Sequence, residues 1–149
     1  MREILFRGKR IDNGEWVEGC YGSHSGIEAF IIDRPYISMN NTLEAMNYYE
    51  VDPETVGQYT GLKDSNGCYV FEGDIVEFED KNAGYAWRGY IVFGNPHGEY
   101  SWGFEIVHLE GTIPNTDILL WFDMEDYGAY SYVIGNIHDT PPELIGGVE

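Results

Sequence analysis

Residues 57–78, GQYTGLKDSNGCYVFEGDIVEF, decide the fold class of this 149-residue chain. Tyr, Thr, Val, Ile and Phe, which favour pleated strands, dominate three short runs within it, at residues 58–60, 68–71 and 75–78. Asn66-Gly67 and Glu72-Gly73-Asp74 separate these runs, and Asn and Gly tolerate the positive φ of tight turns. The stretch therefore predicts successive short strands joined by turns.

The chain before this stretch shows the same alternation. Residues 2–22 are predicted to form a hairpin around Asp12-Asn13-Gly14, with Trp16 as a core anchor on the return strand. A further strand is predicted at Ala29-Phe30-Ile31-Ile32, ended by Asp33-Arg34-Pro35.

Two segments around residue 50 have different local signals. Asn41 to Tyr49 fits either a short helix or a loop leading to a strand, since Leu43 and Met46 have helical spacing whereas Tyr48-Tyr49 favour a strand. In Asp52-Pro53, the aspartate is predicted to cap a helical turn whose first residue is the proline.

Downstream of residue 78 the alternation continues. Strands are predicted at residues 88–93, 102–107, 118–122 and 130–134. The fold is therefore expected to be all-β, with one or two short helical turns, as a small antiparallel barrel or sandwich. A single domain over residues 1–149 is expected, with a division into two β subdomains, about 1–62 and 63–149, as the alternative.

The charge of the chain is strongly negative and unevenly spread. With 26 acidic and 8 basic residues the net charge is −18, which disfavours direct binding to nucleic acid. Half of the bases lie in the first ten residues: Arg2, Arg7, Lys9 and Arg10. These four are the candidate interface residues, since they could meet an acidic surface on the same chain or on a second copy. The favoured interpretation of these charges is nevertheless a solvated edge strand, whose charges discourage unwanted pairing.

Cysteine usage and hydropathy bear on location. Cys20 and Cys68 match no metal-binding or redox spacing, and we interpret them as reduced, half-buried thiols of a cytoplasmic protein. The sequence shows no signal peptide and no apolar run long enough for a membrane span, so no membrane partner is expected.

Motifs for catalysis, cofactors and metals are not found in the sequence. No metal-ligand spacing occurs among the four histidines, which are His24, His97, His108 and His138. The acidic clusters at 77–80 and 123–126 lack calcium-loop spacing and are interpreted as solvated loops. Nucleophile elbows and phosphate-binding loops are also missing. We therefore expect a non-enzymatic protein without a cofactor.

Three segments together resemble the YopX protein family. The first is Arg7-Gly8-Lys9 with Asp12 to Gly19, the second runs from Val51 to Asp64 and on through Asn66-Gly67 to Val76, and the third is Val133 to Asp139 with Pro142-Glu143-Leu144. They follow the family's order and span nearly the whole chain. The resemblance implies a phage or prophage protein with a mainly β fold, whose molecular activity is not established. It supplies no catalytic residue.

Three functions are open at this point. The favoured hypothesis is a non-enzymatic interaction or assembly module that self-associates as a homo-oligomer and that could also bind a host or phage protein. Ring-rich strands with open edges and a basic start fit such contacts. The first alternative is an acidic DNA mimic that binds a host DNA-binding protein. The second is an enzyme whose site only the fold assembles.

Overall fold

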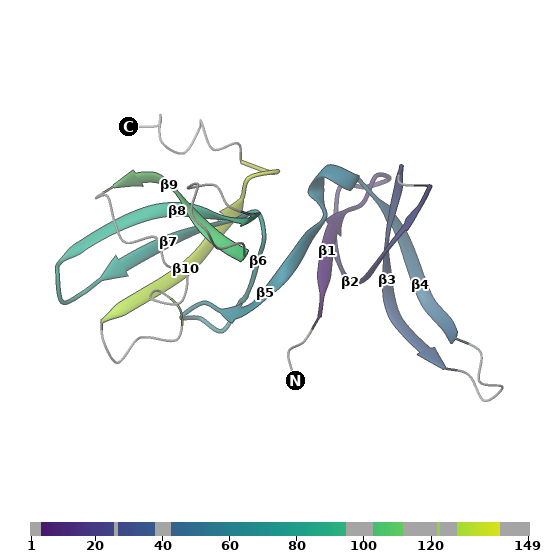
Figure 1. Ribbon diagram of the computed structural model, residues 1–149, viewed down its shortest axis with the longest axis horizontal. Helices are drawn as coiled ribbons and strands as arrows, with labels where there is room; N and C mark the ends of the chain where they lie inside the picture. The colour runs from purple at the N-terminus through teal and green to yellow at the C-terminus, as the bar shows by residue number, and fades with distance from the viewer. Residues whose placement is uncertain are drawn as a thin grey trace. The chain divides into compact units, whose positions relative to one another are not determined.

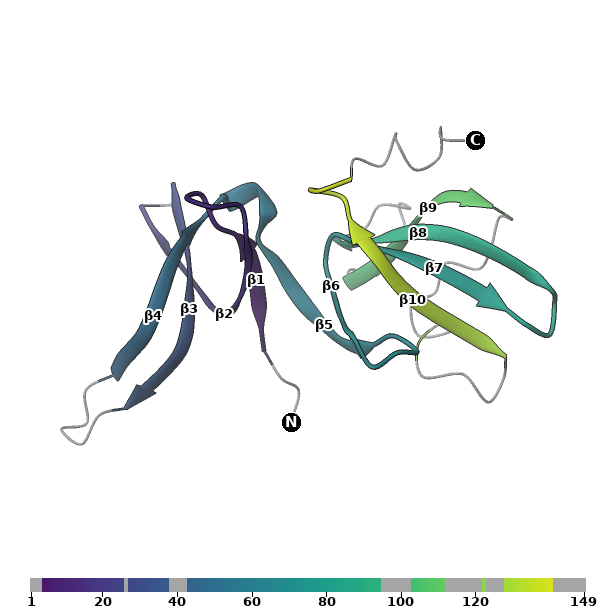
Figure 2. The same ribbon diagram turned by 180° about the vertical axis from the view of Figure 1, so that it is seen from behind.

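The fold consists of two antiparallel β-sheets. The computed structural model describes residues 4–25, 27–37, 43–94, 103–111, 122 and 128–140. The strand order is β4-β3-β2-β1-β5-β6 in the first sheet and β10-β7-β8-β9 in the second (Figures 1 and 2). Helical structure among the described residues is confined to one 3₁₀ turn, η1. The predicted all-β fold is confirmed.

The chain divides into two compact units, Met1–Tyr59 and Thr60–Glu149. Unit 1 contains β1 (Phe6–Lys9), β2 (Trp16–His24), β3 (Glu28–Ile37), β4 (Leu43–Val51) and η1 (Pro53–Thr55). The boundary falls within β5 (Gly57–Lys63). Unit 2 contains β6 (Tyr69–Phe71), β7 (Asp74–Asp80), β8 (Tyr85–Gly94), β9 (Gly103–Gly111) and β10 (Ala129–Asn136).

The predicted N-terminal hairpin forms, and its second strand changes partner halfway. β2 pairs with β1 from Trp16 to Gly19 and with β3 from Cys20 onward. The two backbones approach closely at the switch, because a Cβ on Gly19 would lie 2.2 Å from the carbonyl oxygen of Ile32. Only glycine fits there, so Gly19 allows one strand to serve both neighbours.

A bridge returns β4 to the end of β1. Arg10 pairs with Val51, the Ile11 N–H donates to the Glu50 carbonyl (3.1 Å), and the Asp52 N–H donates to the Lys9 carbonyl (2.9 Å). Among the described residues, unit 1 is thus bridged between the ends of β1 and β4 at one point only. Its core is small: three buried residues, with three half-buried ones packed against them, namely Ala29, Ile31, Val51, Phe6, Val17 and Val56.

The strand pairing corrects two local expectations in unit 1 and decides a third that the sequence left open. β1 is an inner strand between β2 and β5, so the expected solvated edge strand is wrong. β3 does not end at residues 33–35 but runs to Ile37, because β4 pairs with it along this whole length, Pro35 facing Ala45. Residues 43–49, left undecided between helix and strand, belong to β4. A proline removes one ladder hydrogen bond without ending such a two-stranded ribbon.

Trp16 also differs from its expected role. It is half-buried, with the Arg7 guanidinium 4.8 Å from its ring centroid, and it is not part of the buried core. Tyr59 and Ile75, by contrast, are buried.

Unit 2 has a larger core built on aromatic residues. Phe78 on β7 stacks on Trp87 of β8, with ring centroids 4.3 Å apart, and both are buried. The cluster also contains Val70, Val76, Ile91, Ile106 and Phe122. The predicted strand at 118–122 lies outside the described residues, apart from the buried Phe122.

Candidate interaction site

The first and second segments of the family resemblance meet around one hydroxyl group. The Lys9 N–H donates to Thr55 Oγ1 (2.9 Å), and the Thr55 hydroxyl donates to the Asp52 carbonyl (2.6 Å). The Asp52 carboxylate caps η1 by accepting from the Glu54 N–H (3.1 Å), as predicted for Asp52-Pro53. These polar groups join β1 to η1, so their role is structural.

The second and third segments are joined by Asp64, which is buried at 5% exposure. Its Oδ1 accepts from the N–H groups of Asn66 (2.9 Å) and Cys68 (2.8 Å), and its Oδ2 accepts from the N–H of Val133 on β10 (2.9 Å). Three donors satisfy the buried carboxylate, which would be costly to bury alone.

The neighbouring Ser65 completes this contact. Its N–H donates to the Ser131 carbonyl (2.8 Å), and its hydroxyl accepts from the Ser131 N–H (3.0 Å). Residues 64 and 65 therefore occupy the side of β10 that faces away from β7. At the β10 end of the second sheet, the outer side of the strand is thus covered by a turn instead of another strand.

The three candidate interface residues that the structure describes do not form one patch. Arg2 lies outside the described residues. Arg7 and Lys9 share one face of the sheet, opposite Glu18 and Trp16 respectively. Arg10 instead makes a bidentate contact with Asp12, at 2.9 Å from Nε and 2.6 Å from Nη2, and lies 4.5 Å from the Tyr49 ring centroid. Arg10 is thus engaged within its own unit.

The Arg10–Asp12 pair shifts both titrations. The hydrogen bond from Arg10 is the main cause that lowers the pKa of Asp12 below 3.8, and the same bond raises the pKa of Arg10. Both groups are charged at neutral pH, so the contact fixes the loop that follows β1 beside β4.

The outer edge of β4 is the feature of unit 1 that sequence reasoning missed. β4 ends the first sheet, and only its last residues have a second neighbour, the bridge at residues 10 and 11. The Glu50 carbonyl points to that side, since it accepts from Ile11. Because backbone groups alternate sides along a strand, the N–H and C=O of residues 44, 46 and 48 point there too. No strand of the described residues pairs with them.

A hollow lies beside this edge. It has a volume of about 410 Å³ and is lined by residues 10–12 of the loop and 48–50 of β4. Two apolar side chains there are well exposed: Ile11 at 58% and Tyr48 at 69%. The adjoining face of the sheet carries a second, apolar hollow that Phe30, Ile32 and Tyr48 help to line. An extended segment laid along β4 would therefore find both open backbone groups and apolar surface.

The sequence did carry a signal for this edge. Leu43–Val51 reads LEAMNYYEV and contains no lysine, arginine or proline, the residues that usually protect an edge strand. Beyond Ile32, β3 and β4 form a two-stranded ribbon whose other edge is β3. That edge begins with Asp33-Arg34-Pro35 and so has this protection. The signal can be used only once the strand order is known.

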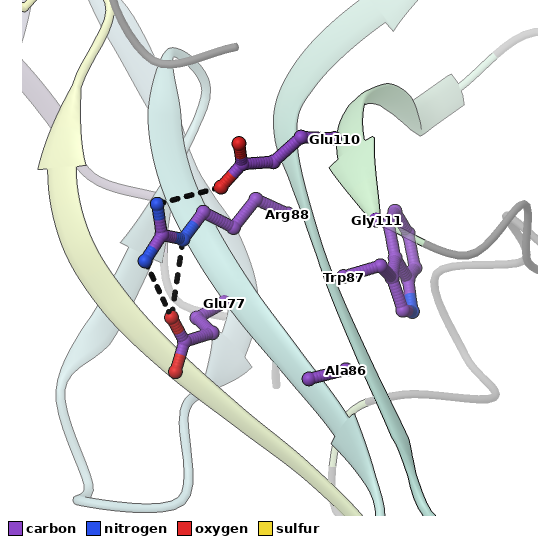
Figure 3. Close-up of a pocket in the computed structure, with 6 residues that line it drawn as sticks. All are labelled: Glu77, Ala86, Trp87, Arg88, Glu110 and Gly111. Carbon is purple, nitrogen blue, oxygen red and sulfur yellow. Dashed lines mark hydrogen bonds and ion pairs between the residues drawn. The ribbon is translucent and has the colours of Figure 1, made fainter. Parts of the chain in front are cut away.

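A third hollow lies on the four-stranded sheet of unit 2 (Figure 3). Arg88 of β8 pairs with Glu77 of β7 through Nε and Nη2, both at 3.1 Å, and with Glu110 of β9 through Nη1 at 2.7 Å. The register places the three residues side by side on neighbouring strands. The hollow of about 330 Å³ thus has its charged groups already paired.

The expectation of a solvated loop at residues 77–80 is therefore wrong. Glu77 and Glu79 belong to β7, where cross-strand pairing with Arg88 and a 3.9 Å contact with Lys81 place them on a sheet face. Asp80 ends the strand and accepts from the N–H groups of Asn82 and Ala83. The second acidic cluster, 123–126, lies outside the described residues.

The cysteines and histidines form no reactive centre among the described residues. Cys20, within β2, and Cys68, just before β6, are free thiols. Both are exposed, not half-buried as expected. His108 lies with Nε2 3.1 Å from the Gly111 carbonyl and its ring stacked near Trp87. The described residues contain no group of three potential metal ligands.

Fold and contacts define the class as an all-β protein of two antiparallel sheets, with buried carboxylates in its turns and, among the described residues, an open strand edge on its first sheet. The family model described as "YopX protein" matches residues 5–145, and the chain belongs to this family. The resemblance inferred from the three segments is confirmed.

One solved structure supports the fold over the whole chain. The crystal structure of protein EF1440 from Enterococcus faecalis is 23% identical, with a TM-score of 0.54, over 95% of this chain and 97% of that one. No curated protein matches the chain. The helical content of the described residues is a single short turn, and no helix there is long and apolar enough to span a membrane.

Proposed function

We propose that this YopX-family protein is a non-enzymatic interaction module that self-associates through unit 1. The observation that carries the proposal is the outer edge of β4, where residues 44, 46 and 48 direct backbone groups away from the sheet and no described strand pairs with them. Strand addition at such an edge is a common mode of protein association.

The distribution of exposed apolar residues supports the same surface. Seven large hydrophobic residues are exposed among the described residues, and five of them belong to unit 1: Ile4, Ile11, Tyr21, Ile27 and Tyr48. Ile11 and Tyr48 flank the hollow at the β4 edge. Exposed apolar groups beside open backbone groups are typical of contact surfaces.

The contacts of the described acids weaken the alternative of a DNA mimic. Asp64 and Asp74 are buried and bind backbone N–H groups, while Glu77 and Glu110 pair with Arg88. Carboxylates used in this way do not form the two phosphate-like rows that mimicry of a duplex requires.

The polar hollows give little support to an enzyme. The charged groups around Arg88 pair with one another, and Arg10 is bound by Asp12 in the hollow beside β4. An acid–base site needs titratable groups poised for proton transfer.

Sedimentation velocity of the full chain over a wide concentration range tests the proposal. We expect a reversible dimer that strengthens with added salt, because copies of charge −18 repel one another and salt screens that repulsion. The variant Tyr48→Glu, at a 69% exposed position, should weaken the dimer, whereas Phe93→Glu, at a 57% exposed position in unit 2, should not. A chain that stays monomeric at high concentration and high salt would refute self-association.

A further inference from the structure

We infer that the partner of the β4 edge is the β4 edge of a second copy, in an antiparallel pair related by a two-fold axis at Met46. The inference rests on the proposed self-association and specifies its geometry. Along β4, residues 44, 46 and 48 direct their N–H and C=O groups outward, on the side where the Glu50 carbonyl already accepts from the Ile11 N–H.

Backbone geometry restricts the registers that such a pair can adopt. In an antiparallel pair, outward-facing residues must lie opposite outward-facing residues. An axis at Met46 places residue 46 opposite residue 46, and residue 44 opposite residue 48, so all three open positions of each copy are used. An axis at Asn47 would place Glu44 opposite Glu50 of the other copy.

Charge decides between these two registers. Like charges directly opposite one another destabilise a strand pair, so the axis at Asn47 is disfavoured. With the axis at Met46, Glu44 faces Tyr48 of the second copy, and no two acids lie opposite. Glu50 stays outside the new ladder, because Ile11 already occupies its carbonyl. The strand is thus self-complementary in one register.

The edges of the ribbon favour a closed dimer over a fibre. The β3 edge beyond Ile32 carries Asp33, Arg34 and Pro35, which oppose further strand addition. Pairing of the β4 edges of two copies gives a two-fold dimer in which this ribbon offers no further site for growth. The exposed Ile11 and Tyr48 lie at the ends of the new ladder, where each could cover the other copy.

Disulfide scanning in the full chain tests the register. The two native cysteines are exposed and are replaced by serine, after which single cysteines are introduced as Glu44→Cys, Met46→Cys and Tyr48→Cys. In the inferred register, two copies of residue 46 have Cα atoms about 5.5 Å apart, within disulfide range. Two copies of residue 44, or of residue 48, are about 13 Å apart and cannot be bridged.

Mild oxidation should therefore cross-link M46C with itself at least about tenfold faster than E44C or Y48C alone. A mixture of E44C and Y48C should yield the mixed dimer. A cysteine-free chain that dimerises in sedimentation, with no preference for M46C, would overturn the inferred pairing and leave self-association standing. A monomeric cysteine-free chain would overturn both.

A second variant pair tests the backbone directly. Tyr48→Pro removes an N–H that points away from β3, so the β3–β4 ladder keeps its hydrogen bonds, while the new ladder loses one in each half. Tyr48→Thr removes the ring and keeps the N–H. If strand pairing holds the dimer, the proline should raise the dissociation constant at least about tenfold more than the threonine. Equal effects of the two variants, with circular dichroism of the native fold, would contradict strand pairing.

Discussion

Strands β4 and β10 each end a sheet and neither contains lysine, arginine or proline, yet the structure treats their outer edges differently. Along β10, the N–H groups of Ser131 and Val133 donate to Ser65 and Asp64. Along β4, the covering loop reaches only Glu50 and Val51. An edge without lysine, arginine or proline is therefore covered in unit 2 by side chains of a turn, whereas in unit 1 most of β4 has no such cover among the described residues.

This difference has a physical basis in the reach of the two covering segments. Asp64 is held rigidly by Asn66 and Cys68, so its second oxygen is presented to Val133 without further loss of freedom. The loop after β1 is fixed by Arg10 and Asp12 at the end of β4 and turns back into β2. The comparison identifies β4 as the surface available for a partner.

The largest expected effect comes from opening the protected edge. Asp64→Ala removes the acceptor of three N–H groups in a buried turn, and the free energy of unfolding should fall by about 3 kcal/mol. The variant should also associate more strongly, because β10, which carries no charged side chain, then becomes an open edge. Chemical unfolding followed by tryptophan fluorescence, and light scattering, measure the two effects.

Asp80→Ala is the matched control for that variant. Asp80 also accepts two backbone N–H groups in a turn, but these contacts are exposed. Its loss should cost at most about 1 kcal/mol, because water replaces the bonds, and scattering should not change. Similar losses from both substitutions would show that the edge contact of Asp64 adds nothing to an ordinary turn.

In the cores of the two units, an added methyl group would meet different kinds of atoms. A Cβ on Gly8 would lie 2.7 Å from Val51 Cγ2, and one on Gly89 would lie 2.7 Å from both Ile106 Cγ2 and the Val107 carbonyl oxygen. Each alanine variant should lose about 2 kcal/mol of unfolding free energy. Gly8→Ala meets only the Val51 side chain, whereas Gly89→Ala also meets fixed backbone.

Double variants distinguish the two cases. Adding Val51→Ala to Gly8→Ala should recover about 1 kcal/mol relative to the sum of the single effects, since two of the three close atoms are removed. Adding Ile106→Ala to Gly89→Ala should recover nothing, because the carbonyl stays. Equal coupling energies in both pairs would contradict the view that the smaller core adapts more easily.

In unit 1 the Thr55 hydroxyl joins backbone groups of different segments, as the Asp64 carboxylate does in unit 2. Thr55→Val keeps the shape of the side chain and removes both the acceptor for the Lys9 N–H and the donor to the Asp52 carbonyl. We expect a loss of about 1–1.5 kcal/mol in thermal or chemical unfolding. Thr55→Ser keeps the hydroxyl and should lose less, and a valine variant as stable as the wild type would show that neither bond contributes.

Much of this fold could be predicted because its signals are local. Alternating residues and Asn-Gly turns predicted the hairpins around residues 10–15 and 63–68, and Asp52-Pro53 predicted η1. Errors arose where pairing partners decided the outcome. β3 runs past Pro35 because β4 holds it, and β1 is internal because β5 returns beside it. Neither partner can be identified from a short window of sequence.

The candidate site was harder to predict than the fold. Arg7, Lys9 and Arg10 were selected by charge, but the neighbours that define their surroundings, Trp16 and Tyr49, are set by strand register and by the return of β4. The β4 edge could not be recognised from composition, because a strand without lysine, arginine or proline is equally compatible with the interior of a sheet. β10 makes the same point, since only the contact with Asp64 tells the two strands apart.

The smallest expected effect concerns pH and the loop beside β4. The bond from Arg10 lowers the pKa of Asp12 below 3.8, so the folded state binds this proton less readily than the unfolded chain. The stabilisation is therefore present above pH 3.8 and is lost as the pH falls through the folded pKa. Asp12→Asn should be slightly less stable than the wild type at neutral pH, and this difference should shrink in acid.

That difference is measured as the free energy of unfolding of the wild type and of Asp12→Asn from about pH 6 to pH 3. The titration of the other carboxylates is common to both proteins and cancels in the comparison. In an Arg10→Gln background the effect of Asp12→Asn should vanish, because the hydrogen bond that causes the shift has gone. The same background should leave the stability lost through Asp64→Ala unchanged, since Asp64 binds backbone groups of unit 2 only. A difference that persists without Arg10 would mean that Asp12 acts through the turn alone, and the loop beside the open edge would then be held by the Ile11 and Asp52 backbone bonds.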